Sequence, residues 1–233
     1  MNAFASLYGK EVRGLFLQPI AWVVLAVFLL VLGHTFATNL VLTRTASLSR
    51  VLFQAATLLM LLTPLITMRL LSEERRHGTL ELLLATPVRE RHVVLAKFAA
   101  SLTLAGALLL PTLVYPCVLA WLGQPEWGPI YSGYLGLLLL AAFLNALGLA
   151  FSALTANQVV AATLTLGATL LLWMVESLSA VLPVPWDDWV MHLSLLARFT
   201  PFATGAMYLS DAGFFVLGSL FCLFCAVRAL GRR

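Results

Sequence analysis

Few residues in this chain of 233 could carry chemistry, and the usual catalytic patterns are missing from its sequence. There is no G-x-x-x-x-G-K-[ST] phosphate loop, no G-x-S-x-G or H-E-x-x-H motif, and no Cys/His cluster with metal-ligand spacing. We therefore expect no catalytic residue, no metal site and no cofactor bound by this chain. The residues with informative types and spacing lie instead in one polar segment between positions 68 and 87.

The first part of this polar segment predicts a charged helix end. Arg69, Glu73 and Arg76 follow one another at i, i+4 and i+7, so we expect the preceding apolar helix to continue through them without a break. Gly78 is placed to end this helix in a left-handed backbone conformation, which glycine adopts without steric cost.

The second part of the segment predicts a short apolar helix that projects beyond the membrane. Thr79 can cap this helix and Thr86-Pro87 can end it, so that it covers residues 80–85. Leucines exposed on such a helix need a partner surface; the alternative is a solvated, salt-bridged helix end. The residues that we expect to contact a partner are Glu73, Glu74, Arg75, Gly78, Thr79, Leu80, Glu81, Leu82, Leu83 and Pro87.

The composition of the chain indicates that this polar segment belongs to a membrane protein. Apolar residues make up 61% of the chain and charged residues 10%, and the mean hydropathy is +0.98. Soluble domains carry about 25% charged residues, so these values exclude a soluble globular protein and also a disordered one. The net charge of +4 does not indicate a nucleic-acid partner, because the basic residues lie beside apolar runs, as in membrane proteins.

Six apolar runs are long enough to cross a bilayer, which needs about 20 residues per helix. With the N-terminus inside, 11 of the 14 Lys and Arg residues fall on the cytoplasmic side, so both termini are expected to be cytoplasmic. The third run contains Pro111 and Pro116 and should bend near its outer end. The link between the fourth and fifth runs is so short that they should form a tight hairpin. The runs are 20–42, 51–71, 95–122, 133–155, 158–182 and 211–230.

Two further segments are neither spans nor ordinary loops. Residues 1–19 mix apolar and charged side chains and end at Pro19, a pattern typical of an amphipathic helix at the inner membrane surface; the alternative is a frayed polar leader. Residues 183–210 are too polar to span and too aromatic for a free loop, so we expect one or two outer re-entrant helices, broken near Thr200-Pro201. Their candidate gate residues are Trp186, Trp189, Phe199, Pro201 and Phe202.

The sequence resembles the permease subunits of type-2 ATP-binding-cassette exporters, and in particular their gliding-motility-type branch. The resemblance covers essentially the whole chain and is most specific in the polar segment. The residues that carry it there are Pro64, Arg69, Glu73-Glu74-Arg75, Gly78-Thr79-Leu80-Glu81-Leu82-Leu83, Thr86-Pro87 and Lys97. A softer match near the C-terminus runs through Pro201-Phe202, Gly205, Asp211 and Arg232-Arg233.

The resemblance implies that residues 1–233 form one transmembrane permease domain, an all-α, multi-pass protein of the bacterial inner membrane. Residues 72–92 would be a cytoplasmic coupling region whose short helix seats in one of two separate ATPase subunits, which bind the ATP and Mg. It further implies a second permease copy or paralogue, surrounding lipids, and an auxiliary subunit with an outer-side domain. Such a complex uses ATP for export or for mechanical work.

Two other classes of protein agree less well with the sequence. A stand-alone secondary transporter or channel-like protein would typically show internal repeats and broken helices with charges near the bilayer midplane. The first three apolar runs show no convincing repeat in the last three. An intramembrane enzyme is disfavoured because no paired catalytic residues lie within the predicted spans.

Overall fold

The computed structural model describes residues 3–43, 47–78, 89–179 and 192–231, and within these ranges every regular element is a helix. Six helical segments there are long and apolar enough to cross a membrane, which agrees in number and order with the six predicted spans. The site residues Thr79, Leu80, Glu81, Leu82, Leu83, Pro87, Trp186 and Trp189 lie outside the described ranges. The helices are α1 (Ala3–Leu17), α2 (Pro19–Thr43), α3 (Ser49–Thr67), α4 (Ser72–Arg76), α6 (Glu90–Leu109), η1 (Leu110–Leu113), α7 (Val114–Leu122), α8 (Trp127–Leu154), α9 (Gln158–Ser179), α11 (Leu195–Thr204) and α12 (Leu209–Leu230).

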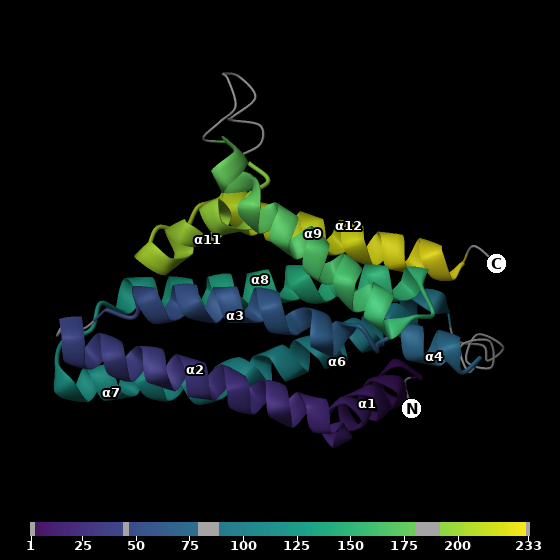
Figure 1. The fold of residues 1–233 in the computed structure, drawn as a ribbon, viewed down its shortest axis with the longest axis horizontal. Helices are drawn as coiled ribbons and strands as arrows, with labels where there is room; N and C mark the ends of the chain where they lie inside the picture. The colour runs from purple at the N-terminus through teal and green to yellow at the C-terminus, as the bar shows by residue number, and fades with distance from the viewer. Residues whose placement is uncertain (1–2, 44–46, 79–88, 180–191, 232–233) are drawn as a thin grey trace.

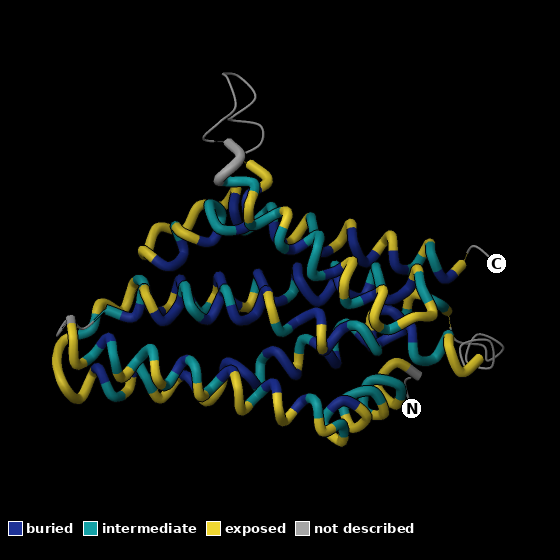
Figure 2. Tube along the Cα trace, viewed as in Figure 1, coloured by how far each residue is buried: buried dark blue, intermediate teal, exposed yellow. Residues whose placement is uncertain are grey.

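The long helices run side by side as a bundle, with α8 at its centre (Figure 1). Helix α8 packs against α3, α6, α9, α11 and α12, and the buried residues lie along the faces that these helices turn toward one another (Figure 2). By contrast, only a small share of α2 and of α9 is buried within the chain, 22% and 17% of their apolar windows. Apolar helix faces left uncovered by protein suit a lipid environment.

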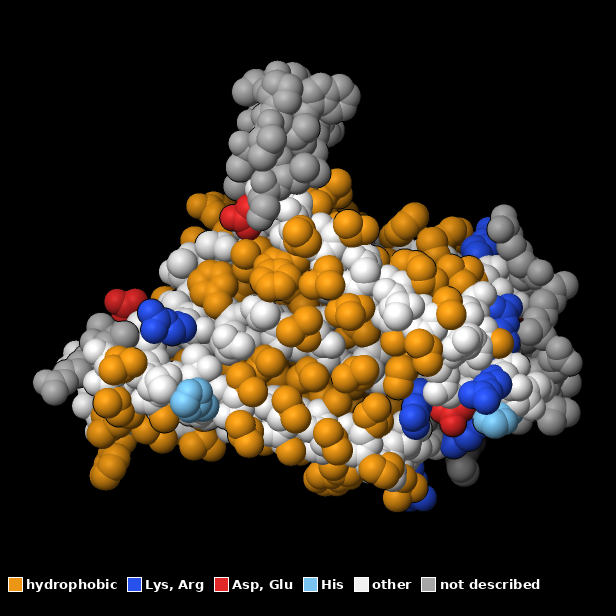
Figure 3. Space-filling view, viewed as in Figure 1, with side chains coloured by type: hydrophobic (Ala, Val, Ile, Leu, Met, Phe, Trp, Pro, Cys, Tyr) orange, Lys and Arg blue, Asp and Glu red, His pale blue; other side chains and the backbone are white. Residues whose placement is uncertain are grey.

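Both termini and α4 lie at one end of the bundle, which we call the terminal end (Figure 1). Lys and Arg side chains gather at this end, while apolar side chains cover the middle of the molecule (Figure 3). Lys and Arg are enriched on the cytoplasmic side of membrane proteins, so their position here agrees with our prediction that the terminal end is cytoplasmic.

Small residues bring α8 close to its neighbours. A Cβ atom added at Gly136 would lie 2.6 Å from the Phe202 side chain, and one added at Gly218 would lie 2.7 Å from the ring of Phe143. Gly148 lies directly against Thr67 of α3, so this glycine serves the α3–α8 contact and not the α8–α9 hairpin next to it. Small residues commonly allow helices to approach closely in membrane proteins.

The predicted hairpin is present, and the third span is interrupted where the bend is predicted. Helix α6 ends at Leu109, a 3₁₀ segment containing Pro111 follows, and α7 then continues to Leu122. Proline lacks the N–H that would close the α-helical ladder, which accounts for the interruption. Only residues 155–157 separate α8 from α9.

Candidate functional site

The first component of the candidate site is a break in the second span, at the terminal end. Helix α3 ends at Thr67, residues 68–71 form turns, and α4 begins at Ser72. We call residues 68–71 the joint. The prediction of one unbroken charged helix through Arg69, Glu73 and Arg76 is therefore wrong.

The physical cause of this break is a side chain on another helix. The Ser152 hydroxyl of α8 accepts hydrogen bonds from the backbone N–H groups of Leu71 and Ser72, each at 3.0 Å. The same hydroxyl donates to the Met68 carbonyl at 3.1 Å. Because these backbone groups bond to Ser152, the helical ladder is interrupted here, and a side chain inserted in this way is a recognised cause of sharp kinks.

Arg75 ties α4 to the same end of α8. Its Nη1 atom donates a hydrogen bond of 2.7 Å to the carbonyl of Ala153. Ala153 lies in the last turn of α8, where carbonyl groups lack helical partners and a positive charge interacts favourably with the helix dipole. Thus one of the predicted coupling residues holds α4 against the centre of the bundle.

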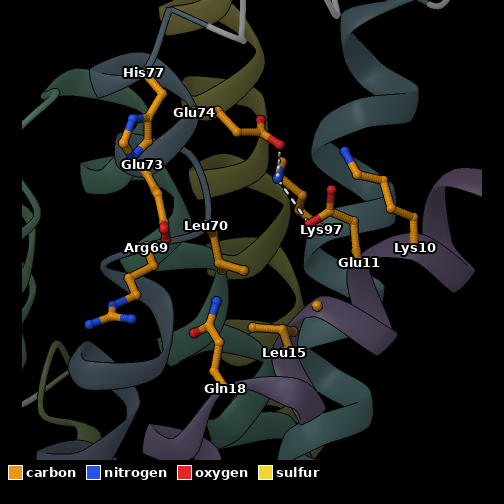
Figure 4. Close-up of a pocket in the computed structure, with 11 residues that line it drawn as sticks. Lys10, Glu11, Leu15, Gln18, Arg69, Leu70, Glu73, Glu74, His77 and Lys97 are labelled. Atoms are coloured by element: carbon orange, nitrogen blue, oxygen red, sulfur yellow. Dashed lines mark hydrogen bonds and ion pairs between the residues drawn. The ribbon is translucent and has the colours of Figure 1, made fainter.

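The second component is a cluster of three charges that we call the triad: Glu11 of α1, Glu74 of α4 and Lys97 of α6. The Lys97 ammonium lies 3.0 Å from Glu11 Oε2 and 2.9 Å from Glu74 Oε1, and Figure 4 shows it between these two carboxylates. The Lys97 side chain is only 2% exposed, whereas those of Glu11 and Glu74 are 11% and 19% exposed. A buried ammonium group is costly unless it is paired, and the two carboxylates supply the partners that offset this cost.

A hollow of about 380 Å³ opens beside the triad, between α1, the joint and α6 (Figure 4). It is lined by polar and charged side chains of both signs together with a few apolar ones. The lining residues are Lys10, Glu11, Gly14, Leu15, Gln18, Arg69, Leu70, Glu73, Glu74, His77 and Lys97.

Helix α4 ends at the glycine that the sequence indicates. Gly78 has a φ of +68°, which confirms the predicted left-handed conformation. The backbone N–H groups of His77 and Gly78 bond to the carbonyls of Glu73 and Arg75, closing the last turn of the helix. The predicted short helix over residues 80–85 lies outside the described ranges and remains a prediction. The next described residue is Arg89, directly before α6.

At the opposite end of the bundle, α11 contains the described part of the predicted outer gate. Phe199 and Phe202 are fully buried, and the Phe199 ring meets that of Phe53 edge-on at 5.8 Å. Ser132 of α8 donates a 2.7 Å hydrogen bond to the Phe202 carbonyl, and Ser49 donates one of 3.0 Å to the Ala203 carbonyl. Hence α11 packs directly on α3 and α8.

The predicted break near Thr200-Pro201 is wrong, because α11 runs through Pro201 to Thr204 and is capped by Gly205. A proline removes a single N–H from the ladder, and here the contacts of both buried phenylalanines hold the helix together. Gly205 has a φ of +95° and lies against Pro129, so the stop falls at the residue suited to a left-handed conformation.

Two outer residues that sequence reasoning left without roles are joined in the structure. Arg198 Nη1 lies 2.6 Å from Asp211 Oδ1, and the Arg198 guanidinium also lies 5.3 Å from the centre of the Phe214 ring. Asp211 occupies the first turn of α12, where negative charge is favoured. A carboxylate at the start of an apolar run is the sequence signal that could have pointed to this pair.

The sequence model of a family described as ABC-2 family transporter protein matches residues 5–205. This match covers most of the chain, and it includes α1, the joint, α4, the triad and α11. The chain therefore belongs to the ABC-2 transporter family and is a multi-pass membrane protein with the character of an ABC transporter permease. No curated protein matches the chain.

Proposed function

We propose that this chain is the permease subunit of an ABC transporter in which separate cytoplasmic subunits bind and hydrolyse ATP. Residues 72–92 would form the coupling region, and its short helix would seat in the partner ATPase. The chain itself performs no chemistry in this proposal; ATP and Mg belong to the partner subunit.

The observation that supports this function best is the way α4 is held next to the predicted docking helix. Glu74 and Arg75 are neighbours in sequence, yet Glu74 pairs with Lys97 of α6 while Arg75 bonds to the end of α8. A force that the ATPase exerts on residues 79–88 would be transmitted to α4, and through its contacts to both α6 and α8. This is the arrangement that transmission from an ATPase to membrane helices requires.

The finer assignments follow from the sequence resemblance. We infer the gliding-motility-type branch, two ATPase copies, a second permease copy or paralogue, and an auxiliary subunit with an outer-side domain, all in a bacterial inner membrane. The direction of work would be export or mechanical action. At the outer end, α11 would be re-entrant and would cover the exit between the two permease subunits.

Co-purification tests the proposal directly. The tagged full-length chain, co-expressed with its candidate ATP-binding subunit, should retain that subunit through affinity purification. Glu81→Lys places a charge of the wrong sign in the first turn of the docking helix and should reduce retention. Glu126→Lys makes the same change in the loop before α8, at the other end of the bundle, and serves as the matched control. Equal retention of the ATPase by both variants would contradict the proposed docking site.

A further inference from the structure

The triad joins the coupling region to a helix outside it. Helix α1 packs along α6, with Leu15 buried and the Tyr8 hydroxyl 2.8 Å from the Thr103 hydroxyl oxygen. Through Glu11, the same helix reaches the Lys97 ammonium that also holds Glu74 of α4. One ammonium group therefore links the N-terminal helix to the part of the chain next to the predicted ATPase contact.

The link between α1 and α4 consists of ion pairs between largely buried side chains. Two carboxylates approach one ammonium from different helices, and each is more exposed than the lysine between them. Removing the lysine would leave Glu11 and Glu74 as like charges that repel each other. Removing either glutamate would instead leave the ammonium with its other partner, so one helix would be released while the other stayed bound.

Helix α4 is a short unit whose movement would be passed to its neighbours through its side-chain and backbone contacts. It has five residues and is bounded by the joint on one side and by the left-handed Gly78 on the other. Its described polar contacts with other helices include the Ser72 N–H to Ser152 and Arg75 to Ala153, both in α8, and Glu74 to Lys97 of α6. A displacement of α4 therefore acts on the triad, and the triad includes α1.

We propose that Lys97 is a positioning residue that makes α1 move together with α4, so that α1 is a second output of the coupling region. This inference rests on the proposed function for the source of the movement, whereas the link itself is a property of the chain alone. Movement of α1 would act on α2, the span that follows it after residue 18.

Spin labels on α1 and α4 measure the link in the full-length chain in nanodiscs. The labels would be carried by Ala5→Cys and Arg76→Cys, both at exposed positions, after replacement of Cys117, Cys222 and Cys225, which are all free. The labelled protein with Lys97 intact should give one narrow distribution of the distance between the two labels. Lys97→Met should give a distribution at least twice as wide. Lys97→Arg should restore the narrow distribution, because it keeps the positive charge.

Two further variants separate this link from general loss of structure. Glu11→Gln leaves Lys97 paired with Glu74, so the bundle should fold and only the α1–α4 distribution should widen. Arg13→Gln removes a charge from the exposed face of α1, outside the triad, and should give the wild-type distribution. Wild-type widths for both Lys97→Met and Glu11→Gln would overturn the inference.

The final arm adds the ATP-binding subunit and compares the nucleotide-free and ATP-bound complex. With Lys97 and Glu11 intact, ATP should shift both α1 and α4 relative to a label on α8. With Glu11→Gln, the ATP-dependent shift of α4 should remain and that of α1 should be lost. A shift of α1 that persists in Glu11→Gln would contradict the inference. Failure of the ATPase to bind any version would instead count against the proposed function, and the widths measured on the chain alone would still decide the link.

Discussion

The side chains of Arg198 and Asp211 lie 2.6 Å apart and tie the short helix α11 to the first turn of α12. Arg198 also bonds through Nε to the His192 carbonyl at 3.2 Å. With side-chain exposures of 17% and 9%, both partners are largely removed from water. The pair thus fixes the outer helix to the last span at a point far from the terminal end.

Breaking this pair should destabilise the outer end of the bundle. We expect Arg198→Gln and Asp211→Asn each to lower the free energy of unfolding by about 1.5–3 kcal/mol, the range for hydrogen bonds to charged groups. The double variant should cost less than the sum of the two single variants, because both remove the same interaction. Reversible unfolding of the detergent-solubilised chain measures the free energy of unfolding for the wild type, the two single variants and the double variant. Strictly additive losses of this free energy would show that the pair contributes nothing.

Ser152→Ala should affect the joint specifically. The change removes the acceptor for the N–H groups of Leu71 and Ser72, and buried unsatisfied groups cost about 1–3 kcal/mol. Ser219→Ala is the matched control, since the hydrogen bond described for that buried hydroxyl lies within its own helix, to the Phe215 carbonyl. Thermal unfolding should show the larger loss for Ser152→Ala. Equal losses would mean that Ser152 does not hold the joint.

Most of the fold can be predicted from the sequence because span length and apolar content are local properties. The positions of Gly78 and Pro111 likewise have local consequences, and both are as predicted. The joint could not be predicted, since it depends on a hydroxyl that lies about 80 residues away in the sequence.

The triad shows the same limit for the site. Its members are separated by 63 and 23 residues along the chain (11 to 74 to 97), and no local pattern joins them. The one available signal was Lys97 itself, a lysine inside the predicted span 95–122, where a charge is unusual and needs a partner. That signal indicates a paired lysine without naming Glu11 or Glu74 as its partners.

Accessibility of the outer helix can be probed by cysteine labelling. Leu193 is half exposed, whereas Phe199 and Phe202 are buried. In a chain lacking its native cysteines, a bulky membrane-impermeant reagent should therefore label Leu193→Cys at least tenfold faster than Phe199→Cys or Phe202→Cys. If α11 covers an exit that opens with ATP, labelling of Phe199→Cys should rise when ATP and the partner subunit are present. Fast labelling of all three positions in the absence of ATP would contradict the packing of α11.

Gly78 should tolerate some side chains better than others. Its φ is +68°, and a Cβ added there meets no atom of the described residues within 4 Å, so the penalty expected from the described part of the chain is that of the backbone conformation. We expect Gly78→Val to weaken retention of the ATP-binding subunit, because left-handed backbone costs other residues about 1–2 kcal/mol. Gly78→Asn should retain it better, since asparagine enters this conformation more readily. Pull-down of the partner ranks the two variants, and equal retention would show that the turn is not needed for docking.

ATP hydrolysis in reconstituted vesicles tests the central claim most directly. The purified chain alone should show no hydrolysis above background, the chain with its ATP-binding subunit should hydrolyse ATP, and Glu81→Lys should abolish the part of that rate that depends on the chain. Robust hydrolysis by a preparation proven free of other subunits would contradict the account, as would an ATPase rate that is the same with and without the chain.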